Sequence, residues 1–258
     1  MAKKIGLALS GGGARGFAHV GVLKVLLEHG LRFDIITGTS AGSIIGGALA
    51  AGMSIDEIES MARRTTYANM MRPSFSLLGL LSNAPMGSFL NREFPVSRFE
   101  DLKLPFGAVA YDLSAGEERL MSNNGDLIFA IRASCAVPGI FCPMKDLDGS
   151  VLVDGGVSSP LPAAAARAMG ADVVIGVDVL SCGGTLMGRP WTALGIAVRS
   201  SLSLIRSASI AQHHLADVVI EPAIAHLRPD QISKCDEFIT LGEAAARARI
   251  TEIDDLIR

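Results

Sequence analysis

The sequence predicts an α/β fold, because short apolar runs alternate with segments of helical composition along most of the chain. The first such pair is an apolar run at residues 4–9, followed by helical spacing at residues 17–29. Composition agrees with this class: 49% of the residues are hydrophobic and 5% are aromatic, which indicates a core of Ala, Val, Ile and Leu. A chain of 258 residues can bury such a core without disulfides, so we expect one domain spanning residues 1–258.

The remaining elements are predicted by local signals. Ser54 and Glu57 have the spacing of a capping box, which predicts a helix over residues 54–64. A turn-forming segment at 113–116 separates two strand-like runs and predicts a hairpin. Strands are expected at residues 33–37, 106–112, 117–122, 151–153, 172–179 and 217–221, and further helices at 43–50, 125–133, 160–169, 191–215 and 236–258.

Residues 66–105 lose this periodicity, and Met, Phe and Leu crowd there among Pro, Gly, Ser and Asn. Two interpretations fit. The segment is a mobile apolar lid, since adaptable Met and Leu surfaces accept varied apolar ligands, or it forms short helices packed on the edge of the sheet.

Bulk charge excludes some partners. The formal net charge of −3 gives no basic footprint for nucleic acid, and Lys3-Lys4 is too short for a polybasic membrane anchor. The apolar stretch after these lysines is too short for a signal peptide, so we expect a cytoplasmic protein with at most peripheral membrane contact. Residues 35–55 lack charge, but their glycines and turn predict a buried strand and helix instead of a membrane span.

The cysteines and histidines predict neither a disulfide framework nor a metal site. No Cys-x-x-Cys pair is present, and the histidines match no metal motif, so we expect no metal and no other cofactor. We expect reduced, mostly packed thiols at Cys135, Cys142, Cys182 and Cys235.

The most informative motif is Gly-Thr-Ser-Ala-Gly at residues 38–42, which lies between an apolar run and a run of helix formers. A serine in a sharp strand-to-helix turn needs neighbours without bulky side chains, and Gly38 and Gly42 meet that need. The start of the following helix would direct free N–H groups and a positive dipole toward Ser40. This pattern predicts that Ser40 is a nucleophile.

A second motif is the glycine loop at residues 10–16, which follows the first predicted strand. Its G-x-G-x-x-G spacing also occurs in dinucleotide-binding proteins, but a ribose-binding acid should close the second strand, whereas Asp34 opens it. A phosphate-binding P-loop also fails, because Phe17 stands where a lysine is required. The remaining hypothesis is an oxyanion hole formed by the N–H groups of Gly11, Gly12 and Gly13.

These motifs, with Asp154-Gly155-Gly156 downstream, resemble those of the patatin-like phospholipases. The segment at residues 16–23 is similar to the bacterial branch related to neuropathy target esterase, and the segment at 133–141 resembles the one that precedes the family's aspartate. The resemblance covers nearly the whole chain. It implies a three-layer fold, with a mostly parallel central sheet and helices on both faces.

The resemblance also implies a chemistry. Ser40 and Asp154 would form a catalytic dyad that cleaves lipid acyl esters through an acyl-enzyme, with no cofactor. An aspartate is costly to bury unpaired, and the hydroxyl of Ser40 is its expected partner. The motif positions that support this site are Arg15, Gly16, Gly38, Gly42, Gly155 and Gly156. Arg15 would either bind a phosphate head group or tie the glycine loop to nearby carbonyls, and the second role is favoured.

Two alternatives remain at this point. Ser40, Asp178 and His226 follow the chain order of an ordinary α/β-hydrolase triad, although that assignment leaves Asp154 and the glycine loop without a role. A binding or regulatory module could instead contact lipid or protein through residues 66–90, but such a module has no need for the serine, the aspartate and the glycine loop together. The sequence predicts neither the particular ester substrate nor the oligomeric state.

Overall fold

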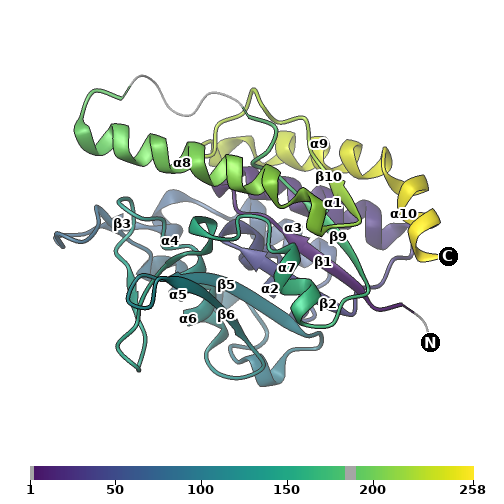
Figure 1. Cartoon of the computed structure of the whole chain (residues 1–258), viewed down its shortest axis with the longest axis horizontal. Helices are drawn as coiled ribbons and strands as arrows, with labels where there is room; N and C mark the ends of the chain where they lie inside the picture. Colours follow the sequence, from purple (N-terminus) through teal and green to yellow (C-terminus); the bar gives the residue numbers. More distant parts are fainter. Residues whose placement is uncertain (1–2, 184–189) are drawn as a thin grey trace.

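The chain is built around one mixed β-sheet, which the computed structural model shows in the order β10–β9–β1–β2–β5–β8–β7, with β6 paired to β5 (Figure 1). The structure describes residues 3–183 and 190–258, so Met1 and Ala2, the start of the expected cytoplasmic N-terminus, lie outside the described residues. The strands are β1 (Ile5–Leu9), β2 (Ile35–Thr39), β5 (Phe106–Asp112), β6 (Glu117–Ser122), β7 (Met144–Lys145), β8 (Val151–Asp154), β9 (Val173–Val177) and β10 (Val218–Ile220).

The strands from β10 to β5 pair in parallel, whereas β6 and β8 are antiparallel to β5. Parallel strands need crossover connections, which here contain the helices that cover the sheet. The mostly parallel α/β fold predicted above is therefore confirmed.

The helices are α1 (Phe17–Glu28), α2 (Ala41–Ala50), α3 (Ile55–Arg63), α4 (Tyr67–Met70), α5 (Ala84–Glu93), α6 (Leu127–Ser134), α7 (Ala163–Ala168), α8 (Ala193–Ala211), α9 (Cys235–Arg247) and α10 (Ile250–Ile257). No helix within the described ranges is both long enough and apolar enough to span a membrane.

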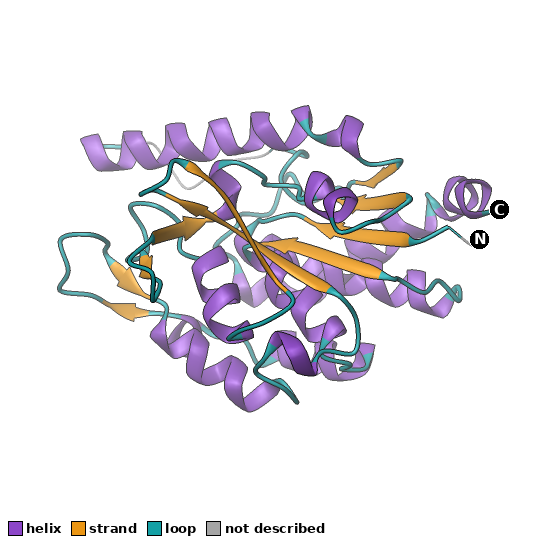
Figure 2. Cartoon of the chain, turned by 60° about the horizontal axis from the view of Figure 1, so that its bottom comes forward, coloured by secondary structure: helices purple, strands orange, loops and turns teal. Residues whose placement is uncertain are grey.

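Successive side chains of β1 point to opposite faces of the sheet, as strand geometry requires, and an apolar layer covers each face. Leu7 and Leu9 of β1 belong to the larger core beneath α1, α2 and α9, while Ala8 packs with α7 in a smaller cluster on the other face. Figure 2 shows helices on both sides of the sheet. Helices α1 and α9 approach closely, because a Cβ on Gly21 would lie 1.9 Å from the carbonyl oxygen of Ile239.

Several local predictions match the structure closely. The hairpin strands have the predicted bounds, and the capping box at Ser54 and Glu57 is formed on both sides. The prediction of one helix over residues 236–258 is wrong: α9 ends at Arg247, and the chain turns before α10. This turn lets Ile253 of α10 pack fully buried in the larger core, which outweighs the local propensity for one continuous helix. The helix expected over 191–215 likewise ends at Ala211, before a short 3-10 turn, η4 (His213–Leu215).

Residues 66–105 form α4, a small hairpin of β3 (Arg72–Pro73) and β4 (Leu81–Ser82), α5, and a 3-10 turn, η2 (Phe99–Asp101). Helix α5 buries Met86, Phe89 and Leu90 in the larger core. Short packed helices are thus present, and motion of this segment as a lid stays a prediction.

Candidate active site

Ser40 lies in the sharp turn between β2 and α2, where it is the N-cap residue of α2. Its backbone has φ 53° and ψ −124°, a conformation that costs a non-glycine residue about 1–3 kcal/mol and is found mainly at functional sites. The turn is tightly packed, since a Cβ on Gly42 would lie 2.2 Å from the carbonyl oxygen of Leu9. Only glycine at position 42 lets α2 begin this close to β1.

Ser134, at the C-terminal end of α6, holds the strained turn in place. Its hydroxyl donates to the carbonyl of Val109 at 2.6 Å and accepts the N–H of Ser40 at 2.8 Å. The Ser40 amide is therefore satisfied in spite of its unusual conformation. The sequence carries no signal for this role of Ser134, because the interaction joins positions 94 residues apart.

Asp154 ends β8 and is buried, and its carboxylate lies close enough to the Ser40 hydroxyl to feel it. One carboxylate oxygen, Oδ1, accepts the N–H of Gly156 at 2.8 Å, while Oδ2 is buried without a hydrogen-bond partner among the described residues. Burial raises the pKa of Asp154 to about 6, against the opposing effects of the nearby Ser40 hydroxyl and the Gly156 N–H. A carboxylate that titrates near neutrality, with a free oxygen next to a serine, is suited to act as a general base.

The glycine loop lies directly against Ser40, because a Cβ on Gly11 would be 3.2 Å from the Cβ of Ser40. The N–H of Gly11 donates to the carbonyl of Pro160 at 3.0 Å and is not available to an oxyanion. Within the described residues, the N–H groups of Gly12 and Gly13 have no protein acceptor. Of the three glycines predicted to form an oxyanion hole, Gly12 and Gly13 therefore remain candidates. The N–H of Ala41, at the start of α2, is a further candidate donor.

Arg15, in the glycine loop, is buried, and its guanidinium contacts residues outside the serine turn. Its Nε and Nη2 atoms both donate to the carbonyl of Leu227, at 3.0 and 2.9 Å, and Nη1 contacts the sulfur of Cys182. Burial lowers the pKa of Arg15. These contacts tie the glycine loop to the segment before α9.

The structure does not assemble the alternative triad of Ser40, Asp178 and His226. Asp178 is fully buried and accepts hydrogen bonds from Ser209 Oγ at 2.7 Å and His213 Nε2 at 2.8 Å. His226 is largely exposed and pairs with a glutamate of α9. The hypothesis fails because the buried aspartate is already saturated by partners from the end of α8 and from η4.

Two further features border the serine. Cys135 lies within 4.0 Å of Ser43, and its own burial, followed by the nearby Asp154 carboxylate, raises the pKa of its thiol. Helix α8 lies over the Asp154 turn, since Ile205 is 3.5 Å from the position of a Cβ on Gly156. Neither contact has a sequence signal, because each depends on how distant elements pack.

The fold and the site define an α/β protein with a strained serine turn between strand and helix, a buried aspartate beside it and a glycine loop against it. A family model described as patatin-like phospholipase matches residues 7–167. The chain belongs to the patatin-like phospholipase family, as the motifs predicted.

Individual relatives agree with this assignment. An uncharacterized NTE family protein of Mycobacterium bovis is 38% identical over 179 residues, which cover 68% of this chain and 49% of the relative. Patatin-like phospholipase domain-containing protein 6 of Homo sapiens is 39% identical over 182 residues, covering 68% of this chain and 13% of that protein. The chain thus spans about half or less of the length of these relatives. The crystal structure of VipD from Legionella pneumophila shares the fold, with a TM-score of 0.52 at 13% identity over 95% of this chain and 67% of that chain.

Proposed function

We propose that this protein hydrolyses fatty-acyl esters of lipids through a Ser40–Asp154 dyad and an acyl-enzyme intermediate. The observation that carries the proposal is the unpartnered, buried Oδ2 of Asp154 beside the strained Ser40 turn. An unsatisfied buried carboxylate oxygen costs free energy, and such a cost is typical of a functional site. Family membership supports a lipid ester as the substrate.

In the first half-reaction, Ser40 Oγ attacks the ester carbonyl carbon while its proton passes to Asp154 Oδ2. The tetrahedral oxyanion accepts hydrogen bonds from the N–H groups of Gly12, Gly13 and Ala41, near the positive end of α2. Collapse breaks the bond to the alcohol, which leaves with the proton held by Asp154. The acyl group then remains on Ser40.

In the second half-reaction, Asp154 takes a proton from water as the water oxygen attacks the acyl carbonyl. Collapse of the second tetrahedral intermediate returns the proton to Ser40 and releases the fatty acid. The same carboxylate thus acts as base and then as acid in each half, which a group with a pKa of about 6 can do near neutral pH.

The deciding experiment is intact-mass analysis after treatment with a fluorophosphonate ester, with the modified peptide mapped. We expect labelling at Ser40 in the wild type and in His226→Ala, and strongly reduced labelling in Asp154→Asn. Hydrolysis of a long-chain acyl ester should be lost in Ser40→Ala. Unchanged turnover in Ser40→Ala, or labelling that depends on His226, would refute the proposal.

A further inference from the structure

Two segments far apart in the sequence present large apolar side chains to solvent at one end of the molecule. The loop between β3 and β4 exposes Phe75, Leu77 and Leu78. Trp191, just before α8, and Leu194, in its first turn, are also exposed. We call these five residues the apolar tip. In Figures 1 and 2 the β3–β4 hairpin and the start of α8 lie at the same end of the molecule, opposite the chain termini.

A common support holds both parts of the apolar tip. Leu81 of β4 donates its N–H to Ile140 at 2.9 Å, and the N–H of Cys142 donates back to Leu81 at 2.8 Å. Leu194 of α8 lies 3.7 Å from the position of a Cβ on Gly139 in the same stretch. The hairpin and α8 therefore rest on one segment, residues 139–142, and form neighbouring parts of one surface.

The exposed loop satisfies part of its own backbone. Ser74 Oγ accepts the N–H of Ser76 at 3.2 Å, and Ser76 Oγ accepts the N–H of Leu78 at 3.1 Å. A further backbone bond from Ser74 to Leu80 closes the loop at 2.9 Å. Backbone groups that are already paired lower the cost of placing a loop in an apolar medium.

The stretches of sequence that contain the apolar tip carry charge of one sign. The chain has 26 acidic residues, yet none lies in residues 60–92 or in residues 179–216, the two stretches that contain the tip. Arg72 lies in β3 of the hairpin itself, and Arg92 is the first arginine that follows the hairpin, in α5. The two stretches of sequence that contain the apolar tip therefore carry basic and no acidic side chains.

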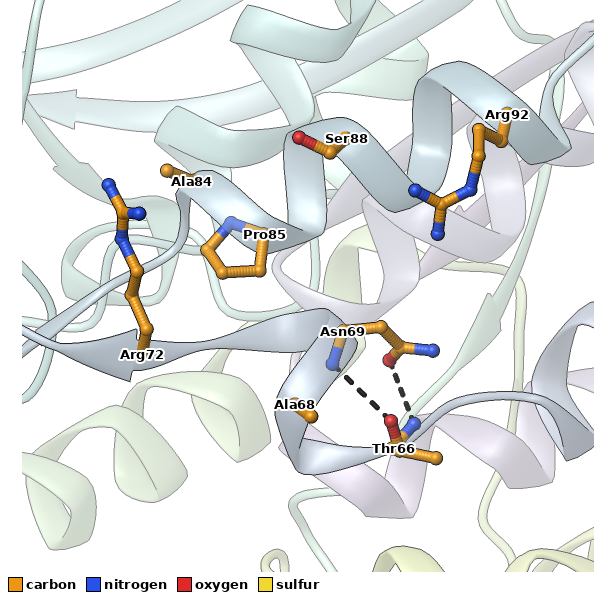
Figure 3. A pocket seen from close by; sticks show the side chains of 8 residues that line it. All are labelled: Thr66, Ala68, Asn69, Arg72, Ala84, Pro85, Ser88 and Arg92. Carbon is orange, nitrogen blue, oxygen red and sulfur yellow. Dashed lines mark hydrogen bonds between the residues drawn. The ribbon is translucent and has the colours of Figure 1, made fainter.

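Arg72 and Arg92 line one pocket of about 560 Å³ between α4, β3 and α5, and the other lining residues are uncharged (Figure 3). Within residues 3–183 and 190–258, these two arginines have no hydrogen bond or ion pair with the protein. The adjacent Arg64, by contrast, pairs with Glu93. Two unpaired guanidinium groups on one open pocket favour an anionic ligand, and guanidinium matches the geometry of phosphate.

We propose that this end of the protein docks on an anionic phospholipid bilayer, with the apolar tip entering the interface and the Arg72–Arg92 pocket taking a lipid phosphate. A narrow projecting loop, a tryptophan and nearby arginines match the physical layers of a bilayer surface, from acyl chains through the interface to the head groups. The charge of these stretches favours an anionic membrane over a second copy of this chain, whose corresponding stretches would carry the same positive charge. The biological role of this docking rests on the proposed lipid hydrolysis, but the binding itself can be measured without turnover.

The test uses Ser40→Ala protein, which holds the lipid intact, and vesicles of phosphatidylcholine with or without phosphatidylglycerol. Trp191 is the single tryptophan and is 87% exposed, so its emission reports docking directly. We expect a blue shift and quenching by brominated lipid with the anionic vesicles. Co-sedimentation should give the matching affinity.

Two double variants separate the contribution of the apolar tip to vesicle binding from that of Arg72 and Arg92. Phe75→Ser with Leu77→Ser should weaken vesicle binding at least about tenfold, because two large side chains lose an apolar environment. Arg72→Gln with Arg92→Gln should weaken binding to anionic vesicles about 25-fold, at about fivefold for each basic group, and leave neutral vesicles unaffected. The matched charge control, Arg249→Gln with Arg258→Gln at the other end of the molecule, should bind like the parent protein.

Every altered side chain in the tip is exposed, so folding should be unchanged, and circular dichroism checks this. When Ser40 is present, both double variants should hydrolyse a soluble short-chain ester at the wild-type rate. This result distinguishes failed docking from failed catalysis. Equal binding to neutral and anionic vesicles, or no effect of either double variant, would overturn the proposal. So would concentration-dependent dimers that the Phe75→Ser and Leu77→Ser changes dissociate, because the tip would then serve a second copy of the chain.

Discussion

The Asp154→Asn variant should be less active and, at neutral pH, more stable than the wild type. An aspartate in the unfolded chain titrates near about 3.9, whereas burial raises the pKa of Asp154 in the folded protein to about 6. Because the folded-state pKa is the higher one, the stabilisation linked to this group is complete below about pH 4 and is lost as the pH rises through about 6. The difference between the folded and unfolded pKa values lowers the free energy of unfolding at pH 7.5 by roughly 3 kcal/mol, relative to its value at low pH.

Asparagine removes the buried charge and keeps an oxygen that can accept the Gly156 N–H. We therefore expect Asp154→Asn to raise the melting temperature by roughly 5–10 °C at pH 7.5, and to change it little at pH 4.5. Its kcat/KM should fall by about 10²–10⁴ through loss of the general base. In the wild type, kcat/KM should decrease about tenfold for each pH unit below about 6.

The measurements are thermal melts of both proteins across this pH range and the pH profile of wild-type ester hydrolysis. Asp178→Asn is the matched control: burial alone would raise the pKa of Asp178, but hydrogen bonds from His213, Ser209 and nearby N–H groups hold it below its usual range. The stabilisation provided by the Asp178 carboxylate is present above the pKa of an unfolded aspartate and is lost as the pH falls. Asp178→Asn should therefore destabilise the protein at pH 7.5. A less stable Asp154→Asn protein at pH 7.5, or a flat wild-type activity profile down to pH 4.5, would refute this account of Asp154.

Three further substitutions test the support of the site. Ser134→Ala leaves the Ser40 N–H without its acceptor, and we expect a loss of about 1–3 kcal/mol in unfolding free energy and a lower kcat. Gly42→Ala places a methyl group 2.2 Å from the Leu9 carbonyl oxygen, so it should cost about 3 kcal/mol or more and prevent labelling of the serine. Arg15→Ala removes both bonds to one carbonyl, and it should reduce hydrolysis of phospholipid and neutral esters by the same factor.

Each of these expectations has a direct check by thermal or urea unfolding alongside the esterase assay. Gly30→Ala is the control for Gly42, because an added Cβ at position 30 meets no atom within 4 Å and only the positive φ opposes it. A Gly42→Ala protein as stable as Gly30→Ala would contradict the packing argument. Selective loss of phospholipid hydrolysis in Arg15→Ala would instead assign this arginine to a head group.

The sequence by itself determined the α/β class, the family and the local shape of the serine turn. These features depend on short-range signals: apolar runs of strand length, the capping box at Ser54, and glycines at positions 38 and 42 beside a serine. Local backbone geometry and hydrophobic periodicity act over a few residues, so they can be inferred without knowing where the rest of the chain lies.

Only the tertiary structure decided which polar groups meet. It paired Asp178 with His213 instead of His226, engaged the Gly11 N–H with Pro160, and brought Ser134 to the amide of Ser40. A hydrogen bond requires atoms within about 3 Å, and the sequence sets no such distance between residues that are far apart along the chain. The roles of Ser40 and Asp154 in catalysis stay predictions for the same physical reason: proximity is a property of the fold, and reactivity has to be measured.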